Sequence, residues 1–298
     1  MLSETVLPEM LPRPPAISVA EYRQRRDALM AQLPDNAAVV LPGAGLMTRS
    51  RDSEFAFRQN SDFYYLTGIR EPDALLVLLP GRAEGESVVF CQDRDPTMEA
   101  WTGRRLGAAG VVAEHEIDQA FENADRDEQL VALLTGRELL YLPLDSGEAV
   151  AVAEEALHSA QAGLRRGRPA LKGWLDISPL IHAMRLIKSD AEIDLLRHAA
   201  VISARAHRRA MQVCRPGLSE FQLQAELEHE FVWQGASGPA YSTIVGSGAN
   251  ACVLHYIENS APLCEDGLVL IDAGAEFELY AGDITRTFPV TGRFSAAQ

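Results

Sequence analysis

The chain has 298 residues, 47% of them hydrophobic, which is enough to bury the cores of one large domain or two smaller ones. Its formal net charge of −15 argues against nucleic acid as a partner, because binding a phosphate backbone needs clustered lysine and arginine. The first ten residues lack the basic and apolar regions of a signal peptide, and no run reaches the roughly 18 apolar residues of a membrane span. We therefore expect a cytoplasmic protein without a membrane partner.

The first part of the chain alternates strand and helix signals. Ser18 and Glu21 form a capping-box pattern that predicts a helix from there to about Leu33. Short apolar runs bounded by glycine, proline or polar residues predict strands at 37–41, 63–66, 74–79, 87–91 and 138–142. Helices are predicted at 127–135 and 149–160. This alternation indicates an α/β domain, which we assign to residues 1–176.

The second part of the chain begins with two capping boxes. Arg165–Pro169 precedes it, a basic stretch that we interpret as an exposed loop near a domain edge rather than a nucleic-acid site. Ser189 and Glu192 open a predicted helix that runs to about Cys214, and a second helix follows from Ser219 to about Gly235. Strands are predicted at 241–245 and 251–255, and the glycines at 246 and 248 are assigned to a turn, not a phosphate loop.

Cysteine spacing excludes two common kinds of site. Cys91, Cys214, Cys252 and Cys264 contain no Cys-x-x-Cys pair, which argues against a zinc ribbon and a redox dithiol. Free thiols are expected in a reducing compartment.

Residues 268–290 read as two apolar strands around a short turn, and each strand carries one aspartate, Asp272 or Asp283. A turn centred on Phe277 and Glu278 would place the two aspartates directly opposite each other, with Cβ atoms ~5 Å apart. Like charges that close repel unless a cation lies between them, and a divalent metal would suit. Acids near hairpins are more often turn formers or solvated, as we expect for Glu276 and Glu278, so spacing alone leaves both interpretations open.

The wider stretch adds a resemblance to a known family. Ile-Asp-Ala-Gly at 271–274 and Gly-Asp-Ile-Thr-Arg-Thr-Phe-Pro-Val at 282–290 resemble the metal hairpin of the aminopeptidase P and prolidase family of pita-bread peptidases. Residues 57–68 resemble the family's N-terminal domain, and 185–192 the start of its catalytic domain. The resemblance implies an α/β N-terminal domain over 1–176, followed by the first half of an α+β pita-bread catalytic domain over 177–298.

The resemblance also implies a chemistry. Asp272 would chelate one of two divalent ions and Asp283 would bridge both, and oxygen-rich ligation with one imidazole suits manganese. His255 would contact the substrate and shuttle protons, although without the resemblance a half-buried strand-end histidine bonded to backbone is the better interpretation. The substrate would be a peptide with an N-terminal Xaa-Pro sequence, since proline lacks an amide N–H and needs a dedicated pocket.

The family pattern is incomplete in this chain. The family uses five ligands, and the histidine and two glutamates that follow the aspartates do not occur after the hairpin. We therefore expect this chain to hold metal weakly, to be inactive alone and to leave a strand edge unpaired. The intact enzyme is expected to be a homo-oligomer, and Trp101 either fills a core or domain interface or reaches a neighbouring subunit.

Two other functions fit the same resemblance. One is a prolidase-type dipeptidase. The other is a non-catalytic peptide-binding module on the pita-bread fold, as in the peptidase-like domains of some histone chaperones. Those modules typically lose the metal aspartates, so the presence of Asp272 and Asp283 favours an enzyme.

Overall fold

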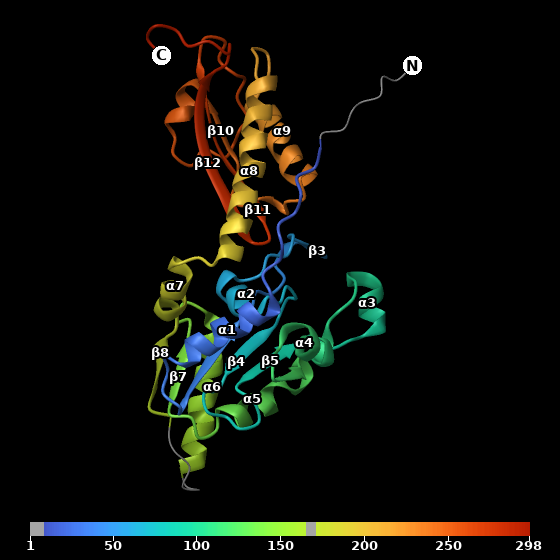
Figure 1. Ribbon diagram of the computed structural model, residues 1–298, viewed down its shortest axis with the longest axis vertical. Coiled ribbons are helices and arrows are strands. Elements are labelled where there is room, and N and C mark those ends of the chain that lie inside the picture. The colour runs from blue at the N-terminus through green and yellow to red at the C-terminus, as the bar shows by residue number, and fades with distance from the viewer. Residues whose placement is uncertain (1–8, 165–170) are drawn as a thin grey trace. The chain divides into compact units, whose positions relative to one another are not determined.

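The computed structural model describes residues 9–164 and 171–298, which form two compact units (Figure 1). One unit contains residues 17–187, and the other contains residues 188–298 together with residues 9–16. Helix α7 (Ser178–Leu186) belongs to the first unit, while a domain boundary after residue 176 stays a prediction. The basic stretch 165–169 lies outside the described residues.

The first unit is built on a six-stranded sheet in the order β6-β5-β4-β1-β7-β8. The pairs β1–β4 and β4–β5 are antiparallel and the others are parallel. The strands are β1 (Ala37–Pro42), β4 (Leu75–Leu78), β5 (Ser87–Cys91), β6 (Gln119–Glu122), β7 (Leu139–Leu142) and β8 (Gly173–Asp176). A separate short hairpin joins β2 (Thr48–Ser50) to β3 (Ser53–Glu54).

Helices cover both faces of this sheet, so its central strands are buried on both sides. Alternate residues of β1 belong to two hydrophobic cores on opposite faces of the sheet. Val39 lies in the core shared with α1, α2, α4 and α7, and Val40 lies in the core shared with α5 and α6. The helices of this unit are α1 (Val19–Met30), α2 (Ser61–Thr67), α3 (Pro96–Thr102), α4 (Gly107–His115), α5 (Arg126–Leu134), α6 (Gly147–Leu164) and α7. The predicted α/β class is confirmed.

The strand predicted at 63–66 is wrong, because these residues lie in helix α2. The Asn60 side chain accepts hydrogen bonds from the amides of Asp62 and Phe63, and Gly68 ends the helix with a φ of +69°. Phe63 and Leu66, three positions apart, are both fully buried. A continuous apolar run fits a buried helix as well as a buried strand, and here the caps decide.

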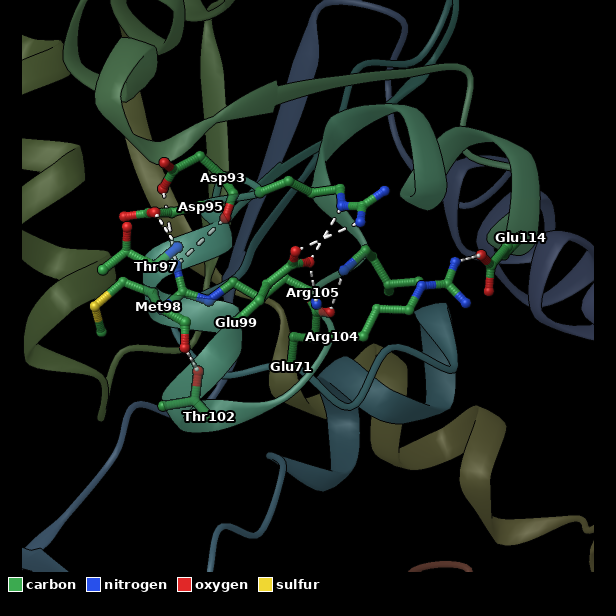
Figure 2. Close-up of polar contacts among 12 residues, drawn as sticks. Glu71, Asp93, Asp95, Thr97, Met98, Glu99, Thr102, Arg104, Arg105 and Glu114 are labelled. Carbon is green, nitrogen blue, oxygen red and sulfur yellow. Dashed lines mark hydrogen bonds and ion pairs between the residues drawn. The ribbon is translucent and has the colours of Figure 1, made fainter.

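Trp101 is 85% exposed on α3, a helix with no buried residue, so the interpretation as core filler is wrong. Figure 2 shows how this helix is held at its base by polar contacts. Glu99 accepts hydrogen bonds from the Arg94 guanidinium at 3.1 Å and from the Arg105 amide at 2.9 Å. These polar contacts join the helix to the segments just before and after it, and no residue of the helix is buried.

The second unit packs two helices on one sheet. In this sheet β11 (Leu268–Phe277) pairs with β12 (Tyr280–Pro289), β10 (Ile244–Ser247) and the short β9 (Gly238–Pro239). The helices are α8 (Asp190–Val213) and α9 (Glu220–Trp233), and both predicted capping boxes are confirmed. In the described part of the chain β12 pairs with β11 alone, which leaves the expected strand edge.

The strand predicted at 251–255 is wrong. Residues 248–252 form a 3₁₀ turn, and 253–255 continue as a loop. The Asn250 side chain of this segment donates a hydrogen bond to the buried carboxylate of Glu220 at 3.0 Å, so Asn250 finds its partner outside any strand ladder. Among the described residues, no helix is both long and apolar enough to cross a membrane.

Candidate metal centre

The hairpin turn lies one residue further along the chain than predicted. Phe277 pairs with Tyr280, so the two turn residues are Glu278 and Leu279, with φ of +53° and +67°. Two left-handed residues make the type I′ turn, whose twist matches that of the flanking strands. The aspartates are therefore not directly opposed, and that prediction is wrong: Asp272 pairs with Thr285, and Asp283 with Gly274.

The two carboxylates nevertheless share one face of the hairpin, because their registers differ by two residues and side chains alternate with a period of two. The Tyr241 hydroxyl lies 2.6 Å from Asp272 Oδ1 and 2.8 Å from Asp283 Oδ1. Its single proton can be donated to either carboxylate in turn. Burial, together with the two neighbouring carboxylates, raises the pKa of Tyr241 above its ordinary value, so the phenol stays protonated and remains a donor.

Glycine explains how the opposite face of the hairpin meets helix α8. A Cβ on Gly282 would lie 2.5 Å from the carbonyl carbon of Ala199, so only glycine allows this approach. Nearby, the Ala275 amide donates to Ser203 Oγ at 2.9 Å. Gly282 thus lets the hairpin pack closely against α8. Asp283 and Asp272 lie on the opposite face of the hairpin, away from this helix.

The acidic face opens into a pocket of about 420 Å³. The pocket is lined by Tyr241, Ser242, Ile244, His255, Ile257, Asp272 and Asp283. The structure therefore brings all three predicted site residues together. His255 reaches the pocket from an exposed loop and not from the end of a strand.

Tyr241 is the site residue that sequence reasoning missed. It follows β9, which pairs with β11 near the hairpin tip, and 31 positions separate it from Asp272. No local spacing marks such a tyrosine, since the pairing of β9 and β10 with β11 brings it to the aspartates.

Glu276 is buried at this same pairing, so its predicted solvation is wrong. Its backbone carbonyl accepts the Ser237 amide at 2.9 Å, and β9 covers the strand where a bare hairpin tip was expected. Glu278, in the turn itself, is half-buried.

The site suits a hard divalent cation, because two carboxylates, which are oxygen ligands, lie within hydrogen-bond distance of the same hydroxyl. Among the described residues, no cluster of three or more histidine, cysteine, aspartate or glutamate side chains could hold a metal. Asp272 and Asp283 alone therefore make an open site with few protein ligands.

Comparison with known families gives two matches along the chain. Residues 22–141 match the aminopeptidase P N-terminal domain, and residues 194–298 match metallopeptidase family M24. The two matches fall in different structural units.

Individual relatives match nearly the whole chain. The chain is 46% identical to Xaa-Pro aminopeptidase of Escherichia coli, over 95% of this chain and 64% of that protein. It is 30% identical to human Xaa-Pro aminopeptidase 3, over 95% of this chain and 58% of that protein. The chain thus spans less than two thirds of the length of these relatives.

Solved structures give the same coverage. The aminopeptidase PepP of Pseudomonas aeruginosa superposes with a TM-score of 0.92 at 46% identity, over 94% of this chain and 64% of that one. Zinc-substituted E. coli aminopeptidase P in complex with product also gives a TM-score of 0.92, at 45% identity, over 95% of this chain and 65% of that one.

Proposed function

Because the chain belongs to the aminopeptidase P family of M24 metallopeptidases, we propose that it is part of a metallo-aminopeptidase that releases the N-terminal residue from peptides with proline in second position. Its two units are the family's N-terminal domain and the first half of the pita-bread catalytic domain. The observation that carries the proposal is the pair Asp272 and Asp283, joined by the Tyr241 hydroxyl in a pocket that also contains His255.

Asp272 and Asp283 are the residues that would hold divalent metal, two ions in the family pattern and manganese by the preference of oxygen donors. Such ions, when bound, lower the pKa of a bound water and polarise a carbonyl. Tyr241 orients the two carboxylates by donating its proton to one or the other. His255, exposed at the pocket wall, would contact the substrate and move a proton.

A site with two carboxylate ligands is expected to bind metal weakly. We therefore expect no robust turnover by this polypeptide alone. Affinity for a divalent ion depends on the number and charge of its ligands, and the described residues supply two carboxylates. We further propose a cytoplasmic protein that forms homo-oligomers.

Manganese titration tests the metal site. Calorimetry of the purified chain should detect Mn²⁺ binding with a dissociation constant on the order of 10⁻⁴ M or weaker. D272N and D283N should each weaken it by about tenfold or more, since each removes one of two charged ligands, a change of about 1.4 kcal/mol or more.

The exposed Asp266 supplies the matched control, because D266N makes the same change just before β11. Unchanged affinity in both hairpin variants, or an equal loss in D266N, would contradict the proposed site. An assay of the chain with Mn²⁺ and an Xaa-Pro peptide tests its inactivity, which robust turnover would refute.

The two alternatives predict different results. A prolidase-type enzyme would cleave Xaa-Pro dipeptides in preference to longer Xaa-Pro peptides. A non-catalytic module would bind peptide and show no Mn²⁺ binding that depends on the two aspartates.

A further inference from the structure

The carboxylate of Glu220, the first residue of α9, is fully buried and accepts four hydrogen bonds. On Oε1 the donors are the Ser247 amide at 2.7 Å and Asn250 Nδ2 at 3.0 Å. On Oε2 they are the Tyr256 hydroxyl at 2.8 Å and the Ala261 amide at 2.9 Å. Four donors match the acceptor capacity of an ionised carboxylate, which makes its burial tolerable.

All four donors come from the single segment 247–261, which carries His255. Tyr256 sits between two pocket residues, His255 and Ile257. Its hydroxyl points to Glu220, while its two neighbours line the pocket. The side chains at 255, 256 and 257 therefore alternate in direction, as in an extended segment.

A second anchor fixes the far side of the loop. Asn259 is buried with a φ of +48°, and its side chain accepts from the Val245 amide at 2.9 Å. It also donates to the Thr243 carbonyl and to Gln224 Oε1, both at 2.8 Å. The loop is thus tied down on both sides of an exposed stretch that contains His255.

We infer that Glu220, acting through the Tyr256 hydroxyl, is a positioning residue that fixes the backbone of His255 and Ile257 at the pocket wall. The inference rests on the function proposed for that pocket. Glu220 touches neither the aspartates nor the space between them, so its role is to hold the loop and not to react. Without this contact the loop between its anchors regains conformational freedom, because residues 252–255 and 257–258 are exposed and little packing restrains exposed backbone.

Backbone NMR relaxation of the metal-free chain tests the inference directly. In the wild type, ¹⁵N order parameters at His255 and Ile257 should be close to the value of about 0.85 that is typical of rigid backbone. E220Q replaces an acceptor oxygen with an amide donor, and Y256F removes the hydroxyl. Both variants should lower the two order parameters to below about 0.6.

A second tyrosine–glutamate pair in the same unit provides the matched control. The Tyr280 hydroxyl donates to the buried Glu192 at 2.8 Å, which is the same chemistry outside the pocket loop. Y280F should leave His255 and Ile257 as ordered as in the wild type. Y256F keeps the other three hydrogen bonds of Glu220, so it decides the matter if E220Q does not fold.

Added Mn²⁺ separates this inference from the proposed function. If the ion binds at the aspartates, it should broaden the ring signals of His255 in the wild type, and several-fold less in Y256F, because the ring then spends time further away. If no broadening occurs in the wild type, the metal proposal fails while the order parameters still decide the positioning role. Unchanged order in Y256F and E220Q, or an equal loss in Y280F, would overturn it.

Discussion

At the scale of single residues, Tyr241 changes the view of the acidic pair. Two carboxylates on one face of a hairpin repel each other, and here a neutral donor lies between them. The pKa of Tyr241 is raised because burial and the two carboxylates disfavour a third negative charge, so the phenol keeps its proton and remains a hydrogen-bond donor. The Tyr241 hydroxyl therefore links the two carboxylates through hydrogen bonds.

Y241F should alter stability in a pH-dependent manner. The unfolded tyrosine loses its proton near its ordinary pKa of about 10, while the folded one keeps it, so the stabilisation is complete below about pH 10 and declines above it. The free energy of unfolding, measured by denaturant titration on either side of that pH, should fall more steeply in the wild type than in Y241F. Parallel profiles would contradict this.

At the scale of elements, α2 shows capping overriding an apolar pattern. Its seven residues include a run that suits a strand, yet Asn60 at one end and Gly68 at the other define a helix. The two side-chain hydrogen bonds of Asn60 satisfy amides that would otherwise lack partners.

N60A should lower the free energy of unfolding of the N-terminal unit by about 1 kcal/mol, the usual cost of losing such a cap. Urea denaturation followed by circular dichroism measures it. N36A removes an exposed side-chain hydrogen bond to Glu138 and should cost less than about 0.5 kcal/mol. Equal losses in the two variants would show that the cap has no special role.

At the scale of the whole molecule, two units fold around separate cores, and large apolar side chains remain exposed on both. Trp101 is prominent among them, because it is 85% exposed on α3, a helix with no buried residue. Exposed tryptophans often anchor interfaces between proteins. This supports the proposed homo-oligomer.

W101A should therefore shift sedimentation equilibrium towards the monomer, with a self-association constant at least about tenfold weaker, as expected for an interface anchor. F221A, which truncates an exposed phenylalanine on α9, should leave the constant unchanged. An equal effect of both variants would point to non-specific contacts.

The sequence by itself determined what depends on neighbouring residues: the capping boxes at Ser189 and Ser219, the apolar central strands, and the two aspartates within a recognisable hairpin. These signals act over a few positions, so the chain carries them before it folds.

Tertiary structure alone decided the rest. The attachment of the His255 loop to Glu220 and the hydrogen bonds from Tyr241 to the two aspartates both depend on contacts between residues distant in sequence. The sequence did not fix the position of the hairpin turn. A shift of the turn by one residue changes every pair of opposed residues in β11 and β12. Distant contacts carry no periodic pattern, and the pocket therefore becomes visible only in the folded chain.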